Sequence, residues 1–105
     1  MKTDYEFLKT EIDGHILTVT INRPERMNAL HPPAHAEFDE VWNEFDKDEN
    51  LWVGIVTGEG DRAFSAGNDL KFQAEAGGKM DINMASSGFA GLTSRFNLTK
   101  PLIAA

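Results

Sequence analysis

The sequence contains no cysteine, and no run of apolar residues approaches the roughly 20 that a membrane-spanning helix needs. Without cysteine the chain can form no disulfide bond, thiolate metal site or cysteine nucleophile. The opening residues, MKTDYEFLK, carry charges where a signal peptide has its apolar segment, and they are neither Arg-rich nor Ser-rich like a transit peptide. We therefore expect a soluble globular protein of a bacterial-type cytoplasm, with no membrane partner.

Basic residues are also few: 10 Lys and Arg stand against 17 Asp and Glu, which gives a formal net charge of −7. Because nucleic-acid binding depends on clustered Lys and Arg, no nucleic-acid partner is expected. Residues 37–49 hold seven acids and one lysine, which predicts a solvated acidic helix face. The rest of the chain can still form a local cationic pocket for a small anion. Its basic candidates lie beside turns or the Gly-rich loop: Arg23, Arg26, Arg62 and Lys71.

The first half of the chain has the pattern of two strands and a helix. Alternating residues over 5–12 and 16–21, joined by Asp13-Gly14, predict a β-hairpin. A helix is expected over 33–46, because prolines suit its first turn and an apolar stripe follows at i, i+3, i+4 and i+7. The stripe consists of Phe38, Val41, Trp42 and Phe45.

Two further strands are expected in a parallel sheet. The run 51–56 is nearly continuous in apolar residues, which predicts a strand covered on both faces. Residues 102–105 begin another buried strand at the point where the sequence stops. The ββαβ order indicates an α/β domain, and a strand begun so late indicates a fragment.

The segment between these strands is less regular. Residues 69–76 predict a short helix closed by Gly77-Gly78. Residues 79–88 are small and polar without a clear period, so we expect them to be mobile. A helix of about ten residues is expected next, because apolar side chains recur at i, i+3 and i+7. These are Phe89, Leu92 and Phe96.

The loop GEGDRAFSAGNDLK, residues 58–71, offers few reactive side chains. It lacks the Gly-Lys-Ser/Thr of a P-loop and the third glycine of the dinucleotide fingerprint. Ser65 has no glycine two positions before it, so it is not expected to be a nucleophile on a strained turn. His31 and His35 have the spacing of two zinc ligands, but no third ligand is evident, so no metal site is expected.

The backbone of this loop is therefore the stronger candidate. Small residues leading into a helix expose amide N–H groups that have no intrahelical partner, and the helix dipole adds partial positive charge. Such a site suits a developing oxyanion. An ordinary strand-to-helix turn capped by Asn68 or Asp69 accounts for the same residues and stays open as the alternative.

Three segments read in order, TINRPERMNAL, LWVGIVTGEGDRAFSAGNDLK and TKPLIAA, resemble the N-terminal portion of the crotonase family, the enoyl-CoA hydratases and isomerases. The resemblance implies an α/β, crotonase-like fold, the ClpP/crotonase spiral of ββα units, with residues 1–105 as the N-terminal part of a domain truncated at its C-terminal end. It also implies acyl-CoA thioester substrates, lyase or isomerase chemistry as in fatty acid metabolism, and homotrimers or dimers of trimers. Coenzyme A enters as part of the substrate, and no separate cofactor or metal is implied.

The resemblance also implies roles for particular residues. The backbone N–H of Asn68, which follows Gly67 in AFSAGNDL, would hold the thioester oxygen as it becomes an enolate. The backbone around Ala66, Asp69 and Leu70 would contact the adenine end of coenzyme A. The phosphates would be met by basic side chains of the loops. These are Arg62 and Lys71, with Arg26 as a further contact.

Two departures from the family pattern limit the prediction. Asn68 stands where alanine is common, which leaves the substrate class open. The second oxyanion donor and the acid–base carboxylates would lie beyond Ala105, so the 105-residue chain alone is expected to be inactive. A non-catalytic CoA-binding or oligomerisation module stays open as an alternative, as does a related dehydratase, hydrolase or isomerase reaction.

Overall fold

The predicted hairpin is present in the computed structural model, which describes residues 2–75 and 87–105. Strand β1 (Leu8–Asp13) pairs antiparallel with β2 (Ile16–Ile21), and Gly14 takes a φ of 59° at the turn. The first strand begins later than predicted because the N–H groups of Glu6 and Phe7 donate to the Glu37 carboxylate, each over 2.8 Å. Those amides are therefore not available to a sheet.

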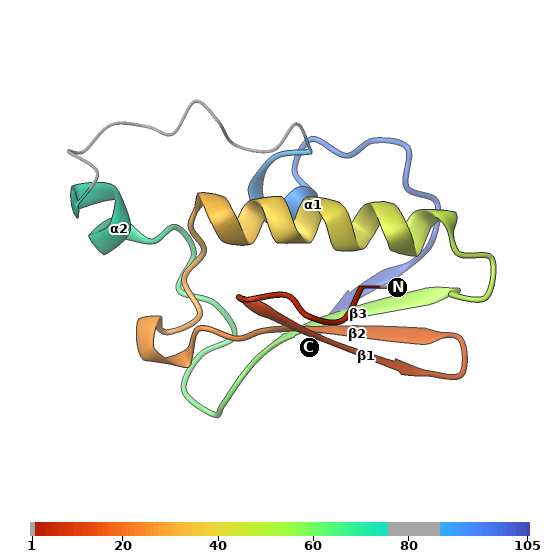
Figure 1. Ribbon diagram of the computed structural model, residues 1–105, viewed down its shortest axis with the longest axis horizontal. Helices are drawn as coiled ribbons and strands as arrows, with labels where there is room; N and C mark the ends of the chain where they lie inside the picture. The colour runs from red at the N-terminus through yellow and green to blue at the C-terminus, as the bar shows by residue number, and fades with distance from the viewer. Residues whose placement is uncertain (1, 76–86) are drawn as a thin grey trace.

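The hairpin opens a four-stranded sheet of order β1-β2-β3-β4. Strand β3 (Val53–Gly58) runs parallel to β2, and β4 (Leu102–Ala104) runs parallel to β3. Helix α1 (Pro32–Lys47) crosses one face of the sheet, and the short helix α2 (Leu70–Glu75) lies at one end of the molecule (Figure 1). The predicted α/β architecture is confirmed.

The core lies between α1 and the sheet. The predicted stripe on α1 is fully buried, and so are the inward-facing residues of β2. Burying a large apolar side chain of this kind is typically worth about 1.5–3 kcal/mol. The helix begins after His31, whose ring accepts from the Ala34 N–H, and Pro32 occupies its first turn, where a missing N–H costs nothing.

The acidic segment 37–49 is only partly the solvated face that was predicted. Glu37 holds the N-terminal segment, Asp39 pairs with Arg95 at 3.1 Å, and Glu40 pairs with Lys2 at 3.7 Å. Several of these carboxylates therefore accept specific contacts from distant parts of the chain. Composition shows charge, but it does not show which elements fold back onto the helix.

Strand β3 also differs from its prediction, because one of its faces is only half covered. Gly54 and Val56 are buried under α1, whereas Val53, Ile55 and Thr57 on the opposite face are half-buried. Among the described residues, helices cover one face of the sheet only (Figure 1). Strand β4 was expected over 102–105 and is confirmed over three of those residues.

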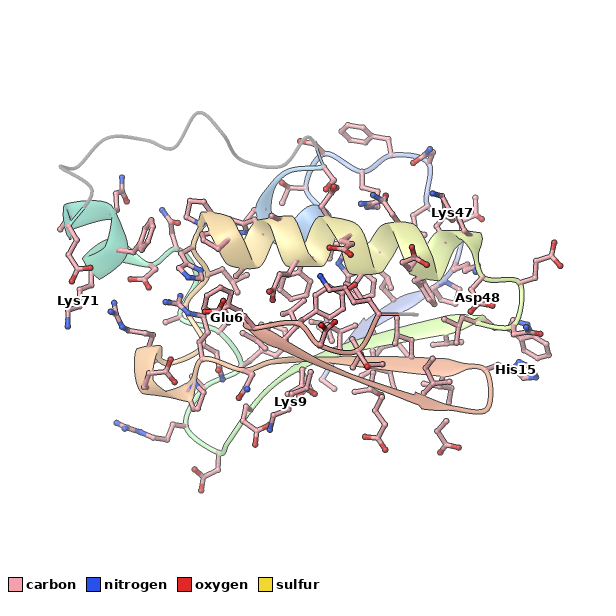
Figure 2. All side chains as sticks on the ribbon, in the orientation of Figure 1. Glu6, Lys9, His15, Lys47, Asp48 and Lys71 are labelled. Atoms are coloured by element: carbon pink, nitrogen blue, oxygen red, sulfur yellow. The ribbon has the colours of Figure 1, made fainter. Side chains whose placement is uncertain are left out.

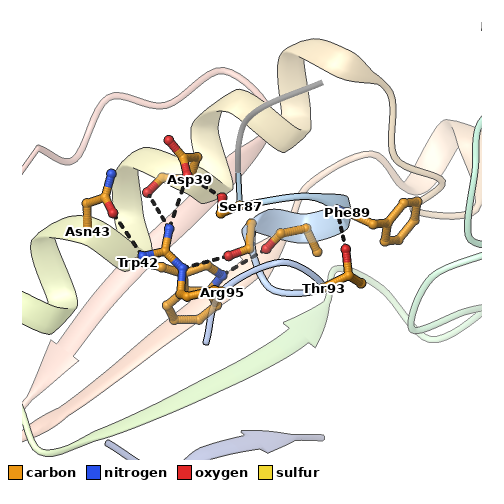
Figure 3. Close-up of polar contacts among 9 residues, drawn as sticks. Asp39, Trp42, Asn43, Ser87, Phe89, Thr93 and Arg95 are labelled. Carbon is orange, nitrogen blue, oxygen red and sulfur yellow. Dashed lines mark hydrogen bonds and ion pairs between the residues drawn. The ribbon is translucent and has the colours of Figure 1, made fainter. Parts of the chain in front are cut away.

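The predicted helix around 89–96 is wrong. Only a 3-10 turn, η2 (Phe89–Gly91), forms there, and Ala90 and Gly91 have φ of 55° and 67°. Contacts to α1 decide this conformation: the Trp42 Nε1–H donates to the Ala90 carbonyl over 3.0 Å (Figure 3), and the Ala90 N–H donates to the His35 Nδ1 over 2.9 Å. The local apolar spacing therefore gives way to tertiary hydrogen bonds.

The Arg95 guanidinium completes this attachment. It donates to the Asn43 side chain over 2.8 Å and to the Asp39 carboxylate over 3.1 Å, and the Ser87 hydroxyl donates to the same carboxylate (Figure 3). Arg95 is only 8% exposed in its side chain. Helix α2 is confirmed, while its predicted closing glycines and residues 79–86 of the predicted mobile segment lie outside the described residues.

Within residues 2–75 and 87–105, no helix is long and apolar enough to cross a membrane. The same residues contain no group of three or more His, Cys, Asp or Glu side chains placed to hold a metal ion.

Candidate functional site

Two loops meet where the parallel strands β2 and β3 end. The first loop (22–31) contains the 3-10 turn η1 (Pro24–Arg26), and the second (59–69) contains the sequence AFSAG. They join in an isolated parallel bridge between Leu30 and Asn68. The Leu30 N–H donates to the Gly67 carbonyl over 2.7 Å, and the Asp69 N–H donates to the Leu30 carbonyl over 2.8 Å.

This bridge fixes the direction of the Asn68 N–H. The C=O of Gly67 and the N–H of Asn68 belong to one planar trans peptide group, so they point in opposite directions. Because the carbonyl points at Leu30, the N–H points away from the first loop. No atom of the described residues accepts a hydrogen bond from it, although Ala66 N–H and Asp69 N–H are both bonded within the fold.

Gly67 supplies the backbone conformation that this arrangement needs. Its φ is 85°, a region that residues with a side chain rarely adopt. A Cβ placed on Gly67 would meet no atom of the described residues within 4 Å, so among these residues the requirement is conformational rather than steric. The Gly67 N–H is held by the Ser65 Oγ over 3.1 Å, and the Ser65 hydroxyl donates to the Asn28 carbonyl over 2.8 Å. Ser65 thus orders the loop.

Asn28 ties the two loops together and was not singled out from the sequence. The residue is 1% exposed. Its Nδ2 donates to the carbonyls of Glu59 and Ala63, each over 2.9 Å, and its Oδ1 accepts from the Arg23 N–H over 3.0 Å. It also has a φ of 55°, which asparagine tolerates better than most residues. The sequence signal that could have indicated this role was an asparagine in a turn that follows a strand.

Asp69 lies beneath the loop and begins α2. One carboxylate oxygen accepts from the Phe72 N–H over 2.9 Å, as a helix cap does, and the carboxylate faces Arg23 at 2.9 Å and Arg26 at 3.6 Å. Burial alone would raise the pKa of Asp69, but the Phe72 N–H and the two guanidinium groups outweigh it, so the pKa lies below its ordinary value. The carboxylate is therefore ionised at neutral pH.

His31 and His35 both make contacts within the fold. The His31 ring caps α1 and packs edge-on between Phe7 and Phe72. Burial, with the Arg23 charge as the next cause, lowers the pKa of His31 to about 4, so the ring is neutral near pH 7. His35 is fully buried and its Nδ1 accepts from the Ala90 N–H over 2.9 Å. Both rings therefore hold elements of the fold together.

The predicted basic residues do not gather in one pocket. Arg23 is buried and paired with Asp69, and Arg26 contacts the same carboxylate. Arg62 is exposed and lines two adjacent hollows of about 140 and 300 Å³. Lys71 is exposed on α2 at one end of the molecule (Figure 2). Arg62 and Lys71 are therefore the two of the four that remain open to a ligand.

The remaining predicted contacts surround Asn68. Ala66, Asn68 and Leu70 are exposed, and Leu70 is 73% exposed, whereas Asp69 is buried. The Asn68 side chain donates to the Gln73 Oε1 over 3.4 Å, which links the loop to α2 through a pair of amide side chains. Neither hollow beside Arg62 includes Asn68 in its wall.

Comparisons with known proteins agree with this arrangement. The family model of enoyl-CoA hydratase/isomerase matches residues 11–105. The chain is 46% identical over 100 residues to a carnitinyl-CoA dehydratase of Escherichia coli, covering 95% of this chain and 38% of that protein. A carnitinyl-CoA dehydratase of Citrobacter koseri is 47% identical over 92 residues, covering 88% of this chain and 34% of that protein.

Solved structures show the same fold. The enoyl-CoA hydratase of Mycobacterium tuberculosis superposes with a TM-score of 0.79 at 35% identity, covering 94% of this chain and 37% of that one. The carnitinyl-CoA hydratase of Mycobacterium avium gives a TM-score of 0.80 at 32% identity, covering 93% and 37%. The chain therefore spans less than two fifths of the length of each of these four proteins.

Proposed function

Because the chain belongs to the enoyl-CoA hydratase/isomerase family, the crotonase family, we propose that the whole protein adds water to, or removes water from, an acyl-CoA thioester. In the dehydration direction a proton leaves Cα and hydroxide leaves Cβ as water, and a double bond forms between the two carbons. The thioester oxygen carries negative charge while the Cα proton is absent. That charge needs a hydrogen-bond donor, and this chain can supply one.

The observation that carries the proposal is the Asn68 N–H, which has no acceptor among residues 2–75 and 87–105. Its direction is set by the Gly67 carbonyl, which is bonded to Leu30, and the following Asp69 N–H is bonded to Leu30 as well. A donor fixed in this way needs no reorganisation when charge develops on the substrate. One such donor is typically worth about 10²- to 10³-fold in kcat. A second donor and the groups that move protons would come from outside this chain.

Coenzyme A would bind along the same loop as part of the substrate, with no separate cofactor. Arg62 and Lys71 are exposed and would face its phosphates, and the exposed stretch Ala66 to Leu70 would contact its adenine end. The Arg26 side chain is 30% exposed and lies 3.6 Å from the Asp69 carboxylate. To contact a phosphate it would have to turn away from that carboxylate. Asp69 itself would contribute by holding the loop, since its N–H and carboxylate are already bonded.

The acyl group we propose is polar, as in carnitinyl-CoA. The relatives at 46–47% identity are carnitinyl-CoA dehydratases, and Asn68 pairs with Gln73 through their amide side chains. The amide oxygens would face the positive charge of a carnitinyl group with the negative ends of their dipoles, and an uncharged acyl chain gains nothing from that contact. Assembly as a homotrimer or a dimer of trimers, and a cytoplasmic location, are part of the same proposal.

The test is product analysis with the full-length protein and a panel of thioesters. The panel contains carnitinyl-CoA, an uncharged 3-hydroxyacyl-CoA and crotonyl-CoA, and each product is identified by the gain or loss of one water in its mass. We expect turnover, fastest with carnitinyl-CoA. Tight binding of coenzyme A without turnover of any thioester would favour a non-catalytic CoA-binding module. Hydrolysis to free coenzyme A would indicate a hydrolase.

A further inference from the structure

The Arg23 side chain spans the two segments that form the Leu30–Asn68 bridge. Its Nη1 donates to the carbonyl of Ala29, the neighbour of Leu30, over 2.5 Å. Its Nη2 lies 2.9 Å from the carboxylate of Asp69, the neighbour of Asn68. One guanidinium group thus contacts both sides of the bridge, one residue away from each bridging residue.

Arg23 is suited to this position by its shape and by its surroundings. Its side chain is 6% exposed and that of Asp69 is 4% exposed, so water competes little with the contact. A guanidinium group is planar and presents several donors in a fixed fork, whereas a lysine ammonium is a single point of charge. Lysine in this place could reach either the carbonyl or the carboxylate, and it would hold the two segments together less firmly.

The bridge in turn determines where the Asn68 N–H points. The peptide group between Gly67 and Asn68 can rotate only if the Leu30 N–H releases the Gly67 carbonyl. The Asp69 N–H holds the next peptide group by its bond to the Leu30 carbonyl. Whatever keeps Leu30 and Asn68 in register therefore keeps the Asn68 donor aimed.

We propose that Arg23 is a positioning residue for the Asn68 amide, acting as a clamp between the Ala29 carbonyl and the Asp69 carboxylate. The inference rests on the proposed function of Asn68 as an oxyanion donor. Arg23 touches no substrate in this account, so its loss should lower kcat and leave KM for the thioester nearly unchanged. Misplacement of a catalytic group by about 1 Å can cost 10²-fold in rate.

Arg95 provides the matched control. It is also a buried arginine that joins a backbone carbonyl, Gly91, to a carboxylate, Asp39, but it fastens the segment after η2 to α1. Replacing either arginine by lysine removes a buried fork and keeps the charge. A purely structural role for Arg23 would therefore make the two variants alike.

The experiment compares Arg23→Lys, Asp69→Asn and Arg95→Lys in the full-length protein. The Asp69→Asn variant keeps an oxygen for the Phe72 N–H and removes the charge that Arg23 meets, so it tests the clamp if Arg23→Lys fails to fold. Steady-state kcat and KM are measured with the best thioester of the panel. Hydrogen exchange of the Leu30 and Asp69 amides is measured relative to amides of β2.

For Arg23→Lys and Asp69→Asn we expect kcat to fall by about 10- to 100-fold with KM changed less than about threefold. The bridge amides should exchange about tenfold faster relative to β2. Arg95→Lys should change neither quantity by more than about threefold. Equal losses of kcat in Arg23→Lys and Arg95→Lys, or unchanged exchange at Leu30 and Asp69, would overturn the inference.

The proposed function can fail separately. If the unmodified protein turns over no thioester, the function is refuted, and the catalytic part of this inference falls with it. The exchange measurement then still decides whether Arg23 clamps the bridge. If exchange quickens in an active protein while kcat stays unchanged, the clamp exists but does not position a catalytic donor, and the inference is refuted alone.

Discussion

Replacing Gly67 with alanine should lower activity far more than stability. A Cβ on Gly67 meets no atom within 4 Å in the part of the chain that the structure describes, so the change introduces no clash there. What remains is the cost of holding a side-chain-bearing residue at a φ of 85°. For the left-handed region this cost is about 1–2 kcal/mol per residue.

The loop can reduce this cost by turning the backbone at Gly67 toward negative φ. That rotation would move the Gly67–Asn68 peptide group and with it the Asn68 N–H. We expect kcat for the thioester to fall by at least about tenfold, up to the 10²- to 10³-fold of a lost oxyanion donor. The free energy of unfolding, measured by urea denaturation, should fall by only about 1–2 kcal/mol.

Gly14 offers the matched control at the β1–β2 turn. Its φ is 59°, and a Cβ placed there also meets no atom within 4 Å. Gly14→Ala should therefore cost a similar free energy of unfolding and leave kcat unchanged. If Gly67→Ala and Gly14→Ala lose kcat equally, or if neither loses any, the argument that Gly67 aims the Asn68 amide is refuted.

Side chains of the two loops and the His31 ring at the start of α1 can be tested by substitution. Asn28→Ala removes three side-chain hydrogen bonds, each worth about 1 kcal/mol, and forces alanine to a φ of 55°. The free energy of unfolding, measured by urea denaturation, should fall by roughly 3–5 kcal/mol. Asn28→Gly should recover about 1 kcal/mol of this loss, because glycine adopts that φ without strain. The pKa of His31 is 6.5 in the unfolded chain and about 4 in the folded protein, so on acidification the unfolded chain binds this proton first. The free energy of unfolding should therefore decrease as the pH is lowered from 6.5 to 4, by roughly 2–3 kcal/mol at about 1.4 kcal/mol per pKa unit. His31→Asn should flatten this decline, and an unchanged slope in His31→Asn would contradict the assignment. Arg62→Ala and Lys71→Ala should each weaken coenzyme A binding by about 0.5–2 kcal/mol in calorimetry, with the lower end favoured by their exposure, and unchanged affinity would remove both from the site.

Elements with a regular period were predictable from the sequence. The stripe Phe38, Val41, Trp42 and Phe45 has helical spacing, and the structure buries all four side chains against the sheet. The hairpin followed from Asp13-Gly14 because the turn needs a residue that tolerates positive φ. In both cases the signal lies within a few residues of the element it defines.

The segment around 89–96 was not predictable in this way. Its apolar spacing is helical, but Phe96 is 90% exposed and the chain turns at Ala90. The bonds from Trp42 and to His35 that hold Ala90 come from 48 and 55 residues away in the sequence. Local periodicity contains no information about such partners.

The candidate site divides in the same manner. The loop with few reactive side chains indicated a backbone role, and the structure leaves the Asn68 N–H without an acceptor among the described residues. The contacts that hold the loop depend on two segments meeting, so Asn28 was missed and Arg23 was counted as part of an open cationic pocket. The structure places Arg23 in a buried ion pair with Asp69 instead.

The central claim is that a main-chain N–H at position 68 stabilises the enolate, and an amide-to-ester exchange tests it most directly. Incorporating the α-hydroxy acid equivalent of asparagine at Asn68 in the full-length protein replaces that N–H by an oxygen and keeps the side chain. We expect kcat to fall by about 10²- to 10³-fold, with KM for the thioester nearly unchanged. A kcat within about threefold of the unmodified protein would contradict it.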